Sequence, residues 1–552
     1  MAEIQDRTTR PASLCVLFLI LVTVLVYIQS IKFPFLGFDD KQFIVQNPHV
    51  QRWASVPSYF TGAEDTSADK NAPKIPNFYR PLVGLWLLLN FKLLGLHPAL
   101  WHISIIATYA LGVWLFWRVA WKLTHNDFVA LAAALLFALH PTHVEGIAWI
   151  SGASVEMLLC VFFLGGFLAY LRWRESQRAV WLVLCGLLTL CALFSKETAA
   201  ALPVLMVCHA LIFHWSPSGA VQRVRPMMRL VLAMAVTTAV YAWLRISAIH
   251  LVSISHPRHS WGEVLRTGPL LFVTYLKMAF WPAPLGTWYE TQIVTVANGT
   301  NFYLPVMICV AYGVLMVWAL VRKPLIGFSL LWWLVSLGPP ILAVRFFPDF
   351  ELVHDRFESI PLAGLCLIAA SALRLLPGKE RFLFGFKAAG VVALAMIVVV
   401  LGVLTARQVS AWESDFAMYK HAVETSPRSV RARILYGNEL IQQNNIRGAL
   451  ILYRDTLNID PDRWETLFAY GVTLAHAGDR PDAIRLLKHG IEVAPKKSPL
   501  YFALADIEAS DGNYDEAFKV IEEGMRVSDQ PEILQREMGL IRSRQAHGAG
   551  KP

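Results

Sequence analysis

The chain has 552 residues, of which 56% are hydrophobic and only 16% are charged. Soluble domains carry about 25% charged residues, so this composition excludes a soluble protein and predicts a membrane protein with many spans. The formal net charge is +9. The basic residues form small clusters between apolar runs, which is the pattern of the positive-inside bias and argues against a nucleic-acid partner.

The first apolar run extends from Ala12 to about Ile31, behind Arg7 and Arg10. It is long enough to cross a bilayer of roughly 30 Å, and no small-residue cleavage signal follows it, so we expect an uncleaved anchor with a cytoplasmic N-terminus. Placing the basic clusters inside gives about eleven spans in total. The expected spans are residues 12–31, 99–121, 128–146, 152–172, 179–195, 198–215, 228–249, 303–321, 325–344, 359–376 and 387–406.

Two further apolar stretches are not counted as spans, because each is interrupted by a lysine. They are residues 263–283, with Lys277, and Pro81–Gly95, with Lys92. We expect both to be interfacial or re-entrant helices on the outer face. The odd number of spans then places the C-terminal part outside. The same face carries a first outer loop, 32–98, and a second large outer segment, 250–302.

A 34-residue repeat predicts a second domain. The period is seen in three sets of residues: Pro427, Pro461 and Pro495; Ala449, Ala483 and Ala517; and Gly437, Gly471 and Ala505. Small residues where two helices meet, and a proline that ends each unit, are the tetratricopeptide pattern. We expect three units from about 428 to 528 and a half-unit from 412 to 426. The predicted domains are therefore a transmembrane domain, 1–409, and a repeat domain, 410–552, of a kind that binds peptides or proteins.

Asp39 and Asp40 lie just after the first span, at the start of the first outer loop. Ionisable groups at a membrane boundary are candidate functional residues, and a carboxylate there can deprotonate a hydroxyl or hold a cation. Taken alone, the dipeptide fits a solvated loop better. Other predicted outer turns are also dense in charge, which indicates a wet cleft on one face.

Five segments of these turns are distinctive: Phe38-Asp-Asp40, Asn77-Phe-Tyr-Arg-Pro81, His140-Pro-Thr-His-Val-Glu145, Ser195-Lys-Glu197 and Asp355-Arg-Phe-Glu358. In this order, and followed by the repeats, they resemble the transmembrane and tetratricopeptide repeat containing proteins, glycosyltransferases of the GT-C fold. The resemblance implies an all-α fold, a GT-C-like membrane bundle followed by a TPR α-solenoid. It also implies an inverting enzyme that transfers a sugar, with mannose as the first guess, from a polyprenyl-phosphate donor to a hydroxyl of a protein.

The resemblance also implies roles for individual residues. By analogy Asp39 would be the general base, and Asp40 would support it or orient the acceptor; adjacency alone does not decide which of the two is the base. A departing lipid phosphate needs fixed positive charge, which Arg356, Arg80 and Lys196 would supply. The candidates for orienting the substrate are Glu145, His143, Glu197, Tyr79 and Asp355.

Four of these roles have a structural alternative that the sequence leaves open. The alternatives are an ion pair of Arg356 with Asp355 or Glu358, contact of Arg80 with headgroups, an ion pair of Lys196 with Glu197, and a turn cap by Glu145. No metal is expected at His140, His143 and Glu145, because Pro141 breaks the helical spacing of ligands. A divalent cation at Asp39 and Asp40 stays open, since GT-C enzymes differ in using one.

A non-catalytic membrane scaffold is the alternative function, with the repeats gathering partners for envelope or polysaccharide assembly. An anchor needs one span, so the many spans with charged outer turns favour the enzyme. A transporter is disfavoured because few ionisable residues lie mid-span. Short loops and a compact repeat array favour a bacterial inner membrane with the repeats in the periplasm; in a eukaryote they would be in the ER lumen.

Overall fold

The structure is a computed structural model that describes residues 2–37, 39–62, 78–214, 220–249, 257–348, 351–377 and 387–548. Phe38 and Asn77, two residues of the motifs above, lie outside these ranges, as do parts of both predicted outer segments. The described residues form helices joined by loops, with no strand among them. The chain divides into two compact units, Met1–Ala417 and Met418–Pro552.

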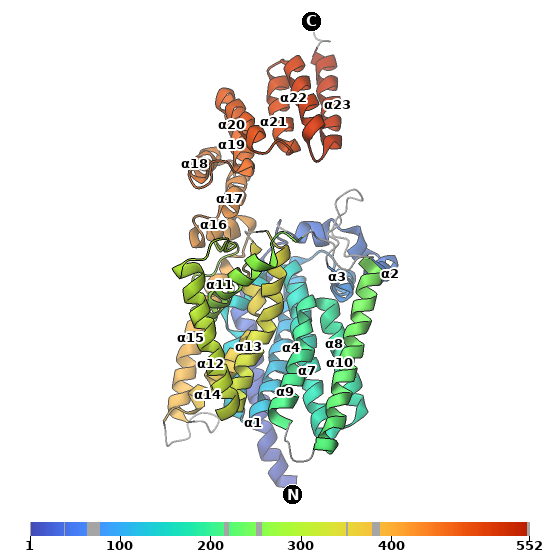
Figure 1. Cartoon of the computed structure of the whole chain (residues 1–552), viewed down its shortest axis with the longest axis vertical. Helices are drawn as coiled ribbons and strands as arrows, with labels where there is room; N and C mark the ends of the chain where they lie inside the picture. Colours follow the sequence, from blue (N-terminus) through green and yellow to red (C-terminus); the bar gives the residue numbers. More distant parts are fainter. Residues whose placement is uncertain are drawn as a thin grey trace. The chain divides into compact units, whose positions relative to one another are not determined.

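The first unit is a bundle of apolar helices that run alongside one another (Figure 1). Those that match the expected spans are α1 (Ala2–Tyr27), α4 (Pro98–Thr124), α5 (Asp127–Ala138), α7 (Ile150–Ser176), α8 (Ala179–Ser195), α9 (Ala201–His214), α10 (Ala220–Ile249), α12 (Leu304–Arg322), α13 (Pro324–Ala343), α14 (Leu362–Arg374) and α15 (Ala388–Ser410). Among the described helices, seven are long and apolar enough to cross a membrane, or eight if one bent pair forms a single span. The segments α8, α9 and α14 are shorter apolar helices. The chain is a multi-pass helical membrane protein.

The bent pair corresponds to residues 128–146, which the sequence predicts as one span. α5 ends at Ala138, and the helical segment Pro141–Ala148 leaves it at 52°. The cause is Pro141, because the residue before a proline is driven out of the helical conformation, and His140 is extended (φ −76°, ψ 128°). The bend places Glu145 at the start of a separate short helix, α6 (Glu145–Ala148).

The two stretches that were not counted as spans are α3 (Pro81–Leu94) and α11 (Trp261–Phe280). Neither is among the helices long and apolar enough to cross a membrane. α3 and the short α2 (Val56–Thr61) lie at the end of the bundle opposite the N-terminus (Figure 1). The interfacial position of α3 and α11 stays a prediction.

The second unit consists of paired helices with the predicted period. After α16 (Asp415–Thr425) come α17 (Val430–Gln442), α18 (Ile446–Leu457), α19 (Trp464–His476), α20 (Arg480–Val493), α21 (Ser498–Ser510), α22 (Tyr514–Val527) and α23 (Pro531–Gly548). The repeated alanines Ala449, Ala483 and Ala517 are fully buried on the second helices of the pairs. α23, which the repeat pattern does not predict, packs on the last pair.

The repeated glycine of the first pair explains why a small residue recurs there. A Cβ atom on Gly437 would lie 2.3 Å from the Tyr453 ring. We therefore expect Gly437→Ala to lower the free energy of unfolding of the repeats by about 1–3 kcal/mol. Gly539 on α23 is the matched control, since a Cβ there meets nothing within 4 Å. Hydrogen exchange of α17 and α18 in the full chain measures the difference, and equal exchange in the two variants would show that the close contact does not limit the fold.

Candidate active site

One segment, residues 145–156, organises the polar contacts at the end of the bundle. A single residue, Trp149, separates α6 from α7, and its backbone is extended (φ −97°, ψ 110°). Four side chains of this segment reach different neighbours: Glu145, Trp149, Ser151 and Glu156. The bend at Pro141 and this break are therefore what place them together.

Glu145 holds the loop that precedes α14. Its carboxylate pairs with the Arg356 guanidinium and accepts a hydrogen bond from the Arg356 backbone amide at 3.0 Å. The Nδ1 atom of His354 lies 3.2 Å from the same carboxylate. The Arg356 guanidinium also lies over the Trp149 ring, 5.1 Å from its centroid. Arg356 is thus fixed at both ends by the 145–156 segment.

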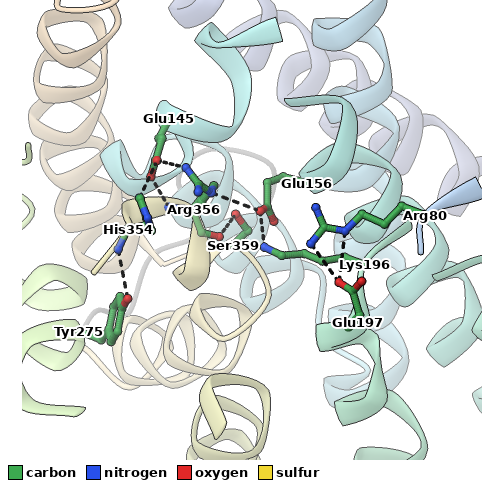
Figure 2. Close-up of polar contacts among 9 residues, drawn as sticks. All are labelled: Arg80, Glu145, Glu156, Lys196, Glu197, Tyr275, His354, Arg356 and Ser359. Atoms are coloured by element: carbon green, nitrogen blue, oxygen red, sulfur yellow. Dashed lines mark hydrogen bonds and ion pairs between the residues drawn. The ribbon is translucent and has the colours of Figure 1, made fainter. Parts of the chain in front are cut away.

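Glu156 extends this network toward the next helix pair. One of its oxygens pairs with Lys196 and lies 4.0 Å from Arg356 Nε. Its other oxygen is buried without a hydrogen-bond partner in the part of the chain that the structure describes. Figure 2 shows the resulting row of alternating charges from Glu145 through Arg356 and Glu156 to Lys196. Glu156, Lys196 and Arg356 also line one small cavity.

Glu197 holds a second pair of cations. It accepts hydrogen bonds from Arg80 Nη2 at 3.0 Å and from Arg80 Nε at 3.2 Å. Arg245 Nη1 donates to the other oxygen at 3.2 Å. The Arg80 guanidinium stacks on Phe78 with its carbon 4.0 Å from the ring centroid. Arg80 is therefore packed and paired, with its side chain only 14% exposed.

The two networks leave a surplus of positive charge. In the ion pairs among the described residues there are four cations, Arg356, Lys196, Arg80 and Arg245, and three carboxylates, Glu145, Glu156 and Glu197, a difference of 4 − 3 = +1.

Two nearby acids have raised pKa values. Burial and the charge of Glu145 raise the pKa of Asp355 well above its usual range, and burial and the charge of Asp355 raise the pKa of Glu358 well above its usual range. Both shifts favour the uncharged form of the acid, and Asp355 accepts a hydrogen bond from the Tyr289 hydroxyl. These two acids therefore offset the cations less than two ordinary carboxylates would.

The two acidic residues of the first loop have different surroundings. Asp40 is fully buried and accepts hydrogen bonds from the backbone amides of Leu36 at 3.0 Å and Ser151 at 2.8 Å, and from the Ser151 hydroxyl. Burial raises the pKa of Asp40 to about 6. Asp39 is only half-buried. Asp40 thus ties the loop to the start of α7, and Asp39 is the more accessible carboxylate.

Comparison with known proteins finds membrane transferases among the relatives of the chain. No family model matches it. It is 21% identical over 462 residues to human protein O-mannosyl-transferase TMTC3, covering 77% of this chain and 49% of the relative. It is 22% identical over 465 residues to Caenorhabditis elegans protein O-mannosyl-transferase F38B6.6, covering 81% of this chain and 62% of the relative. Its homologues are protein O-mannosyl-transferases.

These homologues confirm the family resemblance seen in the motifs. The chain spans about half the length of the human relative and 62% of the nematode one. Among solved structures, apo ArnT from Cupriavidus metallidurans is similar with a TM-score of 0.39 and 15% identity, covering 90% of this chain and 80% of ArnT.

The pairings that the sequence offered as alternatives are wrong. Arg356 pairs with Glu145 and not with Asp355 or Glu358, and Lys196 pairs with Glu156 and not with its neighbour Glu197. Lys196 has an extended backbone (φ −160°, ψ 139°) at the end of α8. Adjacent side chains on extended backbone point to opposite sides, so Lys196 and Glu197 reach different partners.

Two predicted substrate-orienting residues lie in the core. His143 is buried with its ring 4.4 Å from Phe137 and 5.5 Å from Tyr109. Neither ring nitrogen has a hydrogen-bond partner among the described residues. The Tyr79 ring is fully buried, and its hydroxyl donates to the Phe60 carbonyl at 2.9 Å. The surroundings of both side chains favour packing roles.

Sequence reasoning did not assign four residues of these networks: Glu156, His354, Arg245 and Tyr289. Glu156 and Arg245 lie within apolar helices, where an ionisable residue is itself a sign of function. That signal could have identified them. Tyr289 carries no such signal, because its contact with Asp355 depends on the fold of the second outer segment.

A larger cavity, of about 570 Å³, lies apart from the ion pairs and is lined by residues 290–296 with Leu270, Asn298 and Asn301. Within the described ranges, no group of three or more His, Cys, Asp and Glu side chains is arranged to hold a metal ion. The cation that the sequence left open at Asp39 and Asp40 stays untested.

Proposed function

We propose that this chain is a membrane glycosyltransferase that moves a sugar from a polyprenyl-phosphate donor to a hydroxyl group of a protein. The relatives are named protein O-mannosyl-transferases, so mannose is the proposed sugar. The reaction takes place on the face of the membrane that carries Asp39, which we propose to be extracytoplasmic, as the periplasmic side of a bacterial inner membrane is.

The observation that carries this proposal is the double contact of the 145–156 segment. Through Ser151 it binds Asp40, next to the accessible carboxylate Asp39, and through Glu145 and Trp149 it holds Arg356. The neighbour of the proposed base and the proposed phosphate-binding cation are therefore held by one short piece of chain. An inverting sugar transfer needs both a base and such a cation.

In the proposed reaction, the oxygen of the acceptor hydroxyl attacks the anomeric carbon of the donor sugar. Asp39 accepts the proton that this hydroxyl loses. The bond from that carbon to the phosphate oxygen breaks on the opposite side, and the configuration inverts. The lipid phosphate leaves with one more negative charge than it carried in the donor. Asp40 does not touch the substrate, and it positions the loop through Leu36 and Ser151.

The cationic networks fit the donor's charge. A sugar-phosphate-lipid is a phosphodiester with one negative charge, which the excess of cations over carboxylates in these ion pairs would attract. We propose Arg356 and Lys196 as the phosphate-binding cations because they share Glu156 and line one cavity. Arg80 then has a supporting role, since Glu197 occupies two of its donors. Fixed cations in a site with little water stabilise the departing phosphate strongly.

The repeats supply the proposed acceptor site. Helical repeat arrays form concave surfaces that bind extended peptides, and a protein hydroxyl is the proposed acceptor. In this arrangement the repeats recruit a protein and the bundle performs the transfer.

The test is a transfer assay with purified protein in lipid nanodiscs. A synthetic polyprenyl-phosphate mannose and a Ser/Thr-rich peptide are the substrates, and mass spectrometry detects a hexose on the peptide. We expect transfer by the wild-type chain and not by Asp39→Asn. Polyprenyl-phosphate glucose is the control for the choice of sugar.

A deletion strain distinguishes the enzyme from a scaffold. If Asp39→Asn, at normal expression, restores every glycopeptide and envelope property that the deletion removes, the proposed catalytic function is wrong and the scaffold function is favoured. Restoration by the wild-type chain alone supports the enzyme.

A further inference from the structure

Residues 412–415, which follow α15, contact the loop that carries Asp39 and Asp40. Asp415, the first residue of α16, accepts the backbone amide of Gly37 with both carboxylate oxygens, each at 2.8 Å. The contact is close, because a Cβ atom on Gly37 would lie 2.7 Å from one of those oxygens. Gly37 precedes Asp39 by two residues, so Asp415 holds the loop directly beside the proposed base.

The same segment also contacts the support of Arg356. The Trp412 side chain is buried and stacks on Trp149, with ring centroids 6.4 Å apart and an angle of 15° between the rings. Trp149 is the ring over which Arg356 lies. Residues 412–415 therefore touch both the loop of the base and the platform of the phosphate-binding cation.

Hydrogen bonds hold the end of α15, from which residues 412–415 continue, against the end of the first span. Gln29, at the end of the first span, donates its side-chain amide to the Ala406 carbonyl at 2.6 Å. The Ser410 hydroxyl lies 3.4 Å from the Gln29 side-chain oxygen. The backbone amide of Trp412 then donates to the Val409 carbonyl at 3.0 Å. Residues 412–415 are thus held in place where α15 ends, close to the start of the loop that carries Asp39 and Asp40.

We propose that Asp415 and Trp412 are positioning residues for the transfer reaction, which rests on the function proposed above. Asp415 sets the position of Asp39 through the Gly37 amide. Trp412 sets the position of Arg356 through Trp149. Neither residue contacts the substrate in this proposal.

The two roles predict different kinetic defects. Asp415→Ala should lower kcat about tenfold or more with little change in the KM for donor, because a hydrogen bond to a charged group is lost beside the base while the cations stay in place. Trp412→Ala should mainly raise the donor KM. Trp412→Phe keeps an aromatic ring beside Trp149, so its donor KM should be close to the wild-type value. Asp415→Asn should be less impaired than Asp415→Ala, since its amide oxygen still accepts from Gly37.

Hydrogen exchange of the loop in nanodiscs gives a readout that does not need catalysis. In Asp415→Ala, peptides covering residues 33–46 should exchange roughly 10-fold faster or more, because the charge-assisted bond to the Gly37 amide is gone. Gly37→Ala should have the same effect from the other side of the contact. Glu413→Ala is the matched control, since Glu413 is an exposed acid two residues from Asp415.

The outcomes separate this proposal from the function on which it rests. Unchanged exchange in both Asp415→Ala and Gly37→Ala, or faster exchange with unchanged kcat in an active enzyme, would overturn the positioning role alone. A wild-type chain without transfer activity would overturn the proposed function, whatever the loop does. Faster exchange with lower kcat, and normal values in Glu413→Ala, would support the proposal.

Discussion

Replacing Asp39 with asparagine should lower kcat for sugar transfer by about 10²- to 10⁴-fold, which is the usual contribution of a general base. The donor KM should change little, because the cations of the ion-pair networks are not altered. Asp39 is half-buried at the surface of its loop, so the substitution should not unfold the protein. Steady-state kinetics in nanodiscs with varied donor and saturating peptide measure both constants.

Asp40→Asn is the informative comparison. It should also reduce activity, but for a different reason: an asparagine amide would place donor hydrogens against the amides of Leu36 or Ser151. Exchange of residues 33–46 should therefore rise in Asp40→Asn and stay normal in Asp39→Asn. If Asp39→Asn keeps full activity while Asp40→Asn loses it with an intact loop, the assignment of the base is reversed.

Replacing Glu145 with alanine should lower the free energy of unfolding by about 3–5 kcal/mol, because removing one member of a buried ion pair leaves the other unpaired. Glu145 is 2% exposed, and its carboxylate serves Arg356 and His354 together. Activity should fall as well, since Arg356 loses the group that orients it. Thermal unfolding in detergent, combined with the transfer assay, measures both effects.

Glu175→Ala is the matched control for this prediction. Glu175 also pairs with a cation, Lys122; the Glu175 side chain is 46% exposed and that of Lys122 is 9% exposed. Because water reaches the carboxylate of this pair, the loss of Glu175 should cost less than the loss of buried Glu145, and this variant should unfold closer to the wild type. Equal destabilisation by Glu145→Ala and Glu175→Ala would mean that the buried network does not hold the loop before α14.

Several features of the fold follow from the sequence because they depend on residues close together in the chain. The length of an apolar run decides whether a helix can cross a bilayer, and the predicted span 303–321 recurs as α12 (Leu304–Arg322) with nearly the same limits. The 34-residue repeat likewise requires small residues where helices cross, and Gly437 lies against Tyr453 for this reason. The family resemblance, carried by short motifs, belongs to the same class of local information.

Only the tertiary structure decided which charged groups meet. Arg356 and Glu145 are 211 residues apart, and Gly37 and Asp415 are 378 apart, so their contacts depend on how distant helices pack. Sequence distance can also favour the wrong partner, since Lys196 pairs with Glu156 and not with its neighbour Glu197. The different burial of Asp39 and Asp40 has the same origin. The two neighbours in sequence differ because the Asp40 side chain is buried and bonded to the start of α7, whereas Asp39 is only half-buried.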